Sequence, residues 1–121
     1  MASIFVVNGD EEVKYYPLGR RSNVIGRDAT VPVQIVNKRI SRKHMQIRFD
    51  GNEGCYYAID MNSRNGVFVN GRKIETETVL ADGDRIGVGA AEILFTLKDF
   101  PERENALHHF KKVGQHRMTT E

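Results

Sequence analysis

The chain has 121 residues, which fits one domain followed by a short tail, and 40% of them are hydrophobic, as in an ordinary globular protein. No run of about 18 apolar residues is present, so no membrane span is expected. The first nine residues lack the basic lead-in and cleavage site of a signal peptide and are interpreted as a strand. The single cysteine, Cys55, excludes an intramolecular disulfide, is interpreted as a small buried apolar residue, and suits a reducing cytoplasm.

The net charge of +2 hides an uneven distribution. Between Arg20 and Arg48 the chain has eight basic residues and one acid, Asp28, so this segment carries +7 and the rest of the chain −5. A basic segment on a nearly neutral chain predicts an anionic partner at one place. A solvated basic face without a ligand is the alternative. A nucleic-acid interface is a third interpretation, although DNA-binding domains are more often basic throughout.

Short strands are predicted along most of the chain, because apolar and polar residues alternate between frequent Gly and Asn-Gly turns. This pattern is typical of an all-β sandwich or barrel. On the later strands, Met45, Ile47 and Phe49 share one face, as do Cys55, Tyr57 and Ile59, and Ile93, Phe95 and Leu97. The predicted strands are Ile4–Val7, Val13–Leu18, Asn23–Arg27, Val33–Val36, His44–Phe49, Cys55–Asp60, Val67–Val69, Arg85–Val88 and Glu92–Lys98.

The last part of the chain has a different pattern. Pro101 suits the first position of a helix, and Ala106, Leu107, Phe110 and Val113 follow with helical spacing. The sequence therefore predicts a domain over residues 1–98 and a short C-terminal helix and tail over 99–121. A domain of this size is often part of a larger multidomain protein, and that possibility stays open.

Three of the predicted loops are rich in groups that bind oxyanions. They cover residues 25–28, 40–44 and 60–71 and offer arginines, a serine hydroxyl, asparagine amides and glycine-freed backbone amides. In a β-sandwich the loops at one end lie together and often carry the function. A phosphorylated side chain carries about −1.5 to −2 charges and three acceptor oxygens, which arginine matches with paired donors. These loops therefore predict a phosphate site.

The ordered motifs of the chain resemble the forkhead-associated (FHA) domain from about residue 4 to residue 97. They are Gly26-Arg27, Ser41-x-x-His44, Asn65-Gly66 with Asn70-Gly71, and Leu80-x-x-Gly83-Asp84-x-Ile86-x-x-Gly89. The form of residues 60–66 is similar to many bacterial members. The resemblance implies a β-sandwich of about eleven strands that binds threonine-phosphorylated proteins or peptides in signalling, is not an enzyme and needs no cofactor.

The resemblance also implies roles for individual residues. Those expected to bind the phosphopeptide are Arg27, Ser41, Arg42, Arg64 and Asn65. Ser41 would donate its hydroxyl to the phosphate, and Asn65 would bond the peptide backbone. Arg64 stands where many relatives have a threonine that touches phosphate. Those expected to support the binding loops structurally are Gly26, His44, Gly66 and Asn70.

Other chemical signals are weak. Ser41 and His44 are spaced like a nucleophile and base, but the resemblance makes the histidine structural. The segment from Asp60 lacks the glutamate that closes a calcium loop, and the tail histidines make a poor zinc set, so no metal site is expected. A scaffold of the same fold that binds an unphosphorylated partner is the main alternative. Nucleic acid and membranes are not expected as partners.

Overall fold

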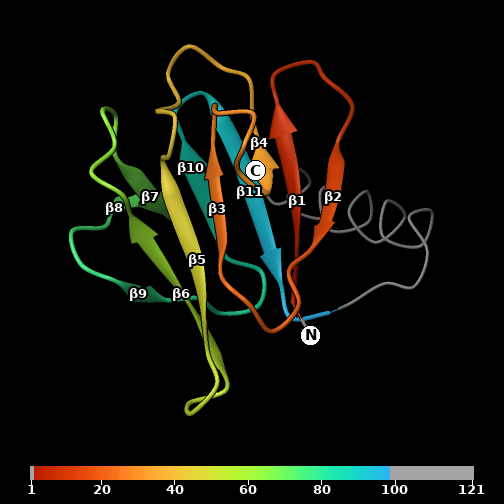
Figure 1. Ribbon diagram of the computed structural model, residues 1–121, viewed down its shortest axis with the longest axis vertical. Coiled ribbons are helices and arrows are strands. Elements are labelled where there is room, and N and C mark those ends of the chain that lie inside the picture. Colours follow the sequence, from red (N-terminus) through yellow and green to blue (C-terminus); the bar gives the residue numbers. More distant parts are fainter. Residues whose placement is uncertain (1, 99–121) are drawn as a thin grey trace, which may run out of the picture.

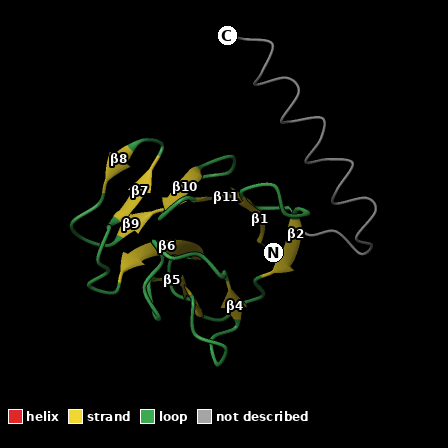
Figure 2. Cartoon of the chain, turned by 90° about the horizontal axis from the view of Figure 1, so that it is seen from above, coloured by secondary structure: helices red, strands yellow, loops and turns green. Residues whose placement is uncertain are grey.

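The computed structural model describes residues 2–98, which form eleven strands in two sheets (Figure 1). The predicted all-β sandwich is confirmed, and helices are absent from this part of the chain. The helix predicted near the C-terminus lies outside the described residues. Seen from above, the two sheets form two layers (Figure 2).

The larger sheet has six strands in the order β2-β1-β11-β10-β7-β8. All of its neighbours pair antiparallel. The strands are β1 (Ser3–Asn8), β2 (Lys14–Pro17), β7 (Val67–Val69), β8 (Arg72–Lys73), β10 (Arg85–Val88) and β11 (Ala91–Thr96).

The smaller sheet has five strands in the order β4-β3-β5-β6-β9. The pair β3 and β4 is parallel, and the other pairs are antiparallel. The strands are β3 (Asn23–Gly26), β4 (Val33–Gln34), β5 (Met45–Asp50), β6 (Cys55–Asp60) and β9 (Thr78–Val79).

The core lies between the two sheets and is made of residues that alternate along the strands. In the larger sheet Ile4, Ile86 and Ile93 are fully buried, and in the smaller sheet Ile25 and Ile47 face them. A second, smaller cluster lies on the other face of the larger sheet, where Phe5 of β1 and Leu94 of β11 are also buried.

The prediction that Cys55 is buried was wrong, because the other face of β6 points into the core. Tyr56 and Ala58 are buried, whereas Cys55 is only half-buried. The register with β5 pairs Ala58 with Ile47 and Tyr56 with Phe49. Residues paired across an antiparallel sheet share a face, so β6 buries the residues opposite the apolar side of β5.

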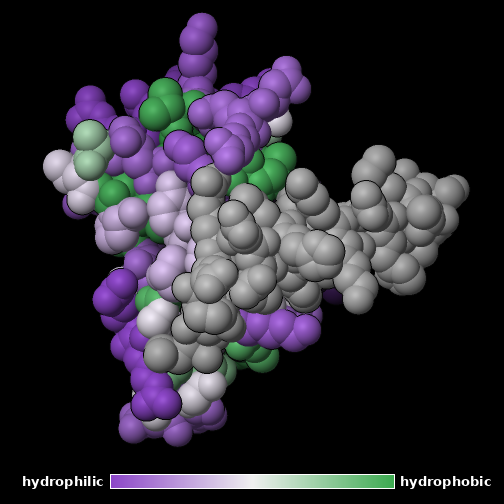
Figure 3. Space-filling view, turned by 90° about the vertical axis from the view of Figure 1, so that its right-hand side faces the viewer, coloured by the Kyte–Doolittle hydropathy of each residue, from purple (hydrophilic) through white to green (hydrophobic). Residues whose placement is uncertain are grey.

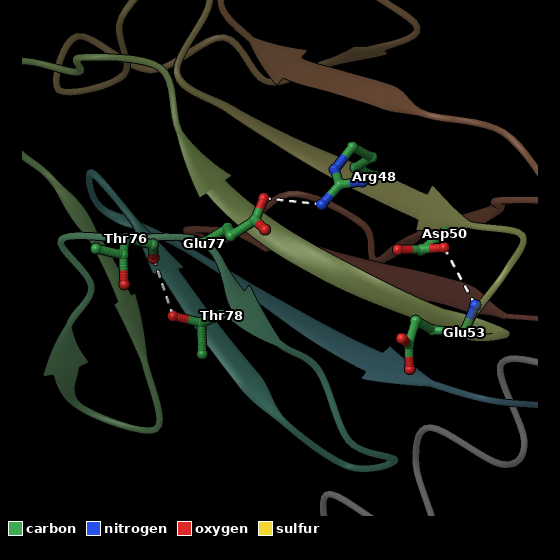
Figure 4. A network of polar contacts seen from close by, with 6 residues as sticks. All are labelled: Arg48, Asp50, Glu53, Thr76, Glu77 and Thr78. Carbon is green, nitrogen blue, oxygen red and sulfur yellow. Dashed lines mark hydrogen bonds and ion pairs between the residues drawn. The ribbon is translucent and has the colours of Figure 1, made fainter.

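The segment between β8 and β9 crosses from one sheet to the other and is attached to β5. Arg48 of β5 forms an ion pair of 2.8 Å with Glu77 (Figure 4), and its guanidinium lies 4.8 Å from the ring centre of Tyr57. The Asp50 carboxylate accepts the backbone N–H of Glu53 at 3.1 Å in the β5–β6 turn. Polar contacts thus attach this segment to β5 and shape the β5–β6 turn.

Among the described residues on the face shown in Figure 3, hydrophilic side chains predominate at the upper and lower ends, and hydrophobic residues form only small patches beside them. None of the described residues belongs to a helix long and apolar enough to cross a membrane.

We expect Val88→Ala to destabilise the domain much more than Val79→Ala, because Val88 is fully buried and Val79 is 55% exposed. Removing two buried methyl groups and leaving a cavity costs about 2 kcal/mol in the free energy of unfolding, against about 0.5 kcal/mol or less for the exposed site. Urea unfolding of both variants measures the difference. Equal losses would contradict the described packing of β10.

Candidate functional site

Three connections come together at one end of the sandwich: β3–β4, β4–β5 and β6–β7 (Figure 1). Backbone hydrogen bonds join the first two, since Arg27 N–H donates to Ser41 O at 3.0 Å and Asp28 N–H to Arg42 O at 3.2 Å. Met61 N–H donates to His44 O at 3.0 Å and attaches the third. The loops predicted from the sequence to carry the function are therefore neighbours, held by main-chain contacts.

Gly26 is required by the close approach of two of these loops. A Cβ atom at this position would lie 2.0 Å from the carbonyl oxygen of Arg42, far inside any allowed contact. The backbone of Gly26 is not in the left-handed region, whereas Gly66 has a φ of 81°. Gly26 is thus required because a side chain would collide with the neighbouring loop, and Gly66 is favoured because its backbone is in the left-handed region.

The imidazole of His44 is fully buried and links two loops. Its Nδ1 accepts the backbone N–H of Ser41 at 3.0 Å, and its Nε2 lies 2.7 Å from Gly66 O. Because a backbone N–H can only donate and a carbonyl can only accept, the proton is on Nε2. Both ring nitrogens are committed to the backbone, so neither is placed to deprotonate the Ser41 hydroxyl.

The hydroxyl of Ser41 lies between the β4–β5 and β6–β7 loops. Its Oγ accepts the backbone N–H of Arg64 at 3.0 Å. A hydroxyl that accepts one bond still has its own proton to donate. We find no acceptor for that proton among residues 2–98, so it is available to an external anion.

The β6–β7 loop is shaped by its own side chains. The Asp60 carboxylate accepts the N–H of Ser63 at 2.9 Å, and Ser63 Oγ accepts the N–H of Gly66 at 3.0 Å. Asp60 therefore works within the loop, and its partners fix the backbone that presents Arg64.

The guanidinium of Arg27 is oriented by one hydrogen bond. Its Nε donates to Ile40 O at 3.1 Å, and the side chain is otherwise exposed. Four of the five guanidinium N–H donors remain on the two terminal nitrogens. The Nε bond holds the plane of the group so that these donors act together on a planar or tetrahedral oxyanion.

A pocket of about 230 Å³ opens between these loops, and we call it the basic pocket. Its lining contains five cations and no acid, and consists of Arg27, Lys38, Arg39, Ile40, Ser41, Arg42 and Arg64. An anion entering it meets positive charge from every loop, with a single buried apolar residue, Ile40, at its wall.

Asp28 is the nearest acid in the sequence to the arginines of the pocket, and it is not part of the lining. The N–H of Thr30 donates to its carboxylate at 3.1 Å. This bond, with smaller contributions from the Thr30 hydroxyl and the charges of Arg42 and Lys43, holds the pKa of Asp28 below its ordinary value. The carboxylate is thus engaged by its own loop.

Asn65 lies next to the basic pocket, and the nitrogen of its side-chain amide is hydrogen-bonded within the domain. Its Nδ2 donates to Arg39 O at 2.8 Å. The side chain is exposed, which leaves the Oδ1 atom as an acceptor for a bound backbone N–H.

Most of the predicted site residues come together, but Asn70 does not join them. Its Nδ2 donates to Asp84 at 2.9 Å, and its Oδ1 accepts the N–H of Arg85 at 3.0 Å, at the opposite end of β7 from Gly66. Asn70 also has a φ of 52°, so it shapes the β7–β8 turn. In contrast, Lys38 and Arg39 line the pocket although their sequence pattern did not single them out.

Comparison with known families agrees with this geometry. The family model of the FHA domain matches residues 23–89, which include all three loops. The chain belongs to the FHA family.

The FHA relatives include FhaA of Mycobacterium tuberculosis, which is 38% identical over 85 residues, covering 70% of this chain and 16% of that protein. The glycogen accumulation regulator GarA of Mycolicibacterium smegmatis is 27% identical over 94 residues, covering 78% of this chain and 58% of that protein. The chain thus spans less than two thirds of the length of these curated relatives.

Solved FHA domains have the same fold. The FHA domain of FhaA in complex with the intracellular domain of Rv3910 has a TM-score of 0.69 and 34% identity, covering 78% of this chain and 99% of that one. A structure described in terms of phosphothreonine-dependent FHA domain interactions has a TM-score of 0.69 and 31% identity, covering 82% and 98%.

We expect Gly26→Ala to disrupt the loops and to lower the stability of the domain by about 3 kcal/mol or more, because the new methyl group collides with the backbone of Arg42. Gly51→Ala is the matched control, since its Cβ would lie 3.8 Å from the Phe49 ring, an ordinary contact. Thermal unfolding of both variants measures the loss. A Gly26→Ala protein as stable as Gly51→Ala would show that the two loops are not in contact.

Proposed function

We propose that this FHA domain binds proteins phosphorylated on threonine, reversibly and without altering them, and that the phosphate enters the basic pocket. The observation that carries the proposal is the Ser41 hydroxyl, whose proton has no acceptor within residues 2–98, in a lining of five cations without an acid. A structure similar to this chain is described in terms of phosphothreonine-dependent FHA interactions, which supports the same ligand.

The pocket supplies several donors to one phosphate. Ser41 donates its hydroxyl, Arg27 donates its terminal N–H groups, and Arg42 adds its side-chain donors. The bond from the Ser41 hydroxyl to the charged phosphate contributes about 1.5–3 kcal/mol, and each exposed arginine contributes about 1 kcal/mol or less. Arg64 lines the same pocket and is assigned to the phosphate or to an acidic group beside it.

The peptide itself is held beside the pocket by Asn65. With Nδ2 bonded to Arg39 O, the Oδ1 atom accepts a backbone N–H of an extended ligand. A phosphate in the pocket and a backbone contact at Asn65 fix two points of the peptide, which sets its register.

The proposed role is binding, not catalysis. His44 is bonded through both ring nitrogens to the backbone and therefore supports the loops without activating Ser41. Gly26 and Gly66 support the same loops through their backbone geometry. We further propose signalling in the cytoplasm, since a lone cysteine suits a reducing compartment.

We expect Ser41→Ala to weaken binding of a phosphothreonine peptide by roughly 10- to 150-fold, because one hydrogen bond to a charged group is lost. Fluorescence polarisation with an oriented phosphothreonine peptide library, and with phosphoserine and unphosphorylated versions, measures the effect. Ser22→Ala is the matched control, since Ser22 is exposed in the β2–β3 loop, outside the lining of the pocket.

Saturable binding that requires the phosphate and is lost in Ser41→Ala supports the proposal. A folded protein that ignores the whole phosphopeptide library, or binds its partner equally well in Ser41→Ala, would contradict it. The fold would then serve as a scaffold for an unphosphorylated partner.

A further inference from the structure

One part of the outer face of the larger sheet is buried, although the smaller sheet lies on the opposite side. Strand residues alternate between the two faces, and Ile4, Val6 and Ile93 belong to the core between the sheets. Phe5 and Leu94 therefore point away from the smaller sheet, yet they are only 0% and 3% exposed. The face of a sheet that does not contact a second layer ordinarily meets water, so this burial requires a cover.

The cross-strand neighbours of this pair supply only part of that cover. Phe5 pairs with Leu94 on one side and with Tyr15 on the other, and the ring centres of Phe5 and Tyr15 are 5.4 Å apart. Val13 and Tyr15 pack against the pair but are themselves only half-buried. A cross-strand neighbour lies beside a residue on the same face, so the covering group lies above the sheet. We call Ser3, Phe5, Tyr15 and Leu94 the outer patch.

Burial on this face increases toward the end of β11. Along β1 the outward residues are Val7, which is half-buried, and Phe5 and Ser3, which are fully buried. Ser3 pairs with Thr96, two residues before the last described residue, and β11 ends beside the start of β1 (Figure 1). The most deeply covered end of the outer patch is therefore the end from which residues 99–121 continue.

We propose that the C-terminal segment of this chain, residues 99–113, forms a helix whose apolar side covers the outer patch. The predicted helix begins at Pro101, and its apolar residues recur with the spacing that places them along one side. These residues are Ala106, Leu107, Phe110 and Val113. The opposite side carries His108, Lys111 and Lys112, which suit contact with water. The inference does not depend on the phosphothreonine function, because the outer patch shares no residue with the basic pocket.

The segment has the length that this position requires. A helix over residues 101–113 is about 20 Å long, since each residue adds about 1.5 Å. The outer patch crosses β2, β1 and β11, which takes about 10 Å at roughly 4.8 Å per strand. Leu94 lies about 13 Å along the strand from the end of the described chain, and the residues that lead to the helix span up to about 10 Å. The folded unit then runs to residue 113 and not to residue 98, where the sequence pattern placed the boundary.

The first test compares two variants of the full chain that place the same negative charge on opposite sides of the predicted helix. Phe110→Asp puts a carboxylate on the apolar side, and His108→Asp, the matched control, puts one on the polar side. Because the outer patch loses its cover, we expect Phe110→Asp to lower the midpoint of thermal unfolding by about 8 °C and to increase binding of the apolar dye ANS. His108→Asp should shift the midpoint by about 3 °C or less.

The second test locates the segment directly. A nitroxide spin label is attached to Lys112→Cys in the Cys55→Ser background, where the introduced thiol is the single one in the chain. We expect the label to broaden the amide NMR signals of Phe5 and Leu94 strongly. The signal of Thr78 should change little, because Thr78 lies in β9, at the far edge of the smaller sheet (Figure 2).

Dilution separates a segment bound to its own domain from one bound to a second copy. Broadening that persists when the labelled, isotope-enriched protein is diluted with unlabelled protein of natural abundance arises within one molecule and supports the proposal. Broadening that disappears on this dilution would place the segment on a second copy and overturn it. Equal midpoint shifts in Phe110→Asp and His108→Asp, or a label that leaves the outer patch unaffected, would overturn it as well.

Discussion

The two hydrogen bonds of the buried His44 ring hold together the loops on which the proposed site depends. Through Nδ1 the ring fixes the backbone of Ser41, and through Nε2 it fixes Gly66, 22 residues further along the chain. A buried polar group without partners costs about 1–3 kcal/mol, so the loops and the ring stabilise one another only in this arrangement. The position of Ser41 is therefore fixed by its hydrogen bond to a side chain buried in the core.

The loops satisfy their own polar groups with asparagine, serine and aspartate, and within residues 2–98 their arginines and lysines form no ion pair with an acid. Asp60 and Ser63 bond the backbone of one loop, and Asn37 does the same in another. An acid used as a backbone acceptor is not available to neutralise a neighbouring cation. The positive field of the basic pocket thus follows from how the loops are built.

The alternation of apolar and polar residues predicted most of the strands. The pairing register of the strands and the two-residue strands could be seen only in the three-dimensional structure. The two-residue strands Arg72–Lys73 and Thr78–Val79 are too short to show alternation, and the sequence pattern missed them. Both faces of β6 contain apolar residues, so only its pairing with β5 decides which one is buried. Among the candidate site residues, the ordered motifs led to Arg27, Ser41, Arg42 and Arg64, which share the pocket. Lys38 and Arg39 were missed because contacts from the distant Asn65 and Gly89 position their turn.

The exposure of the basic side chains limits what each can contribute. A surface ion pair is worth about 1 kcal/mol or less and is weakened by salt, because water and mobile ions compete for both charges. Affinity must then come from several such contacts acting together with the fixed hydroxyl of Ser41 and the amide of Asn65. Those two groups are anchored to backbone atoms at 3.0 Å and 2.8 Å, so they lose little freedom on binding. In the proposed complex the anchored groups therefore fix the position of the ligand, and the exposed cations add an attraction that salt weakens.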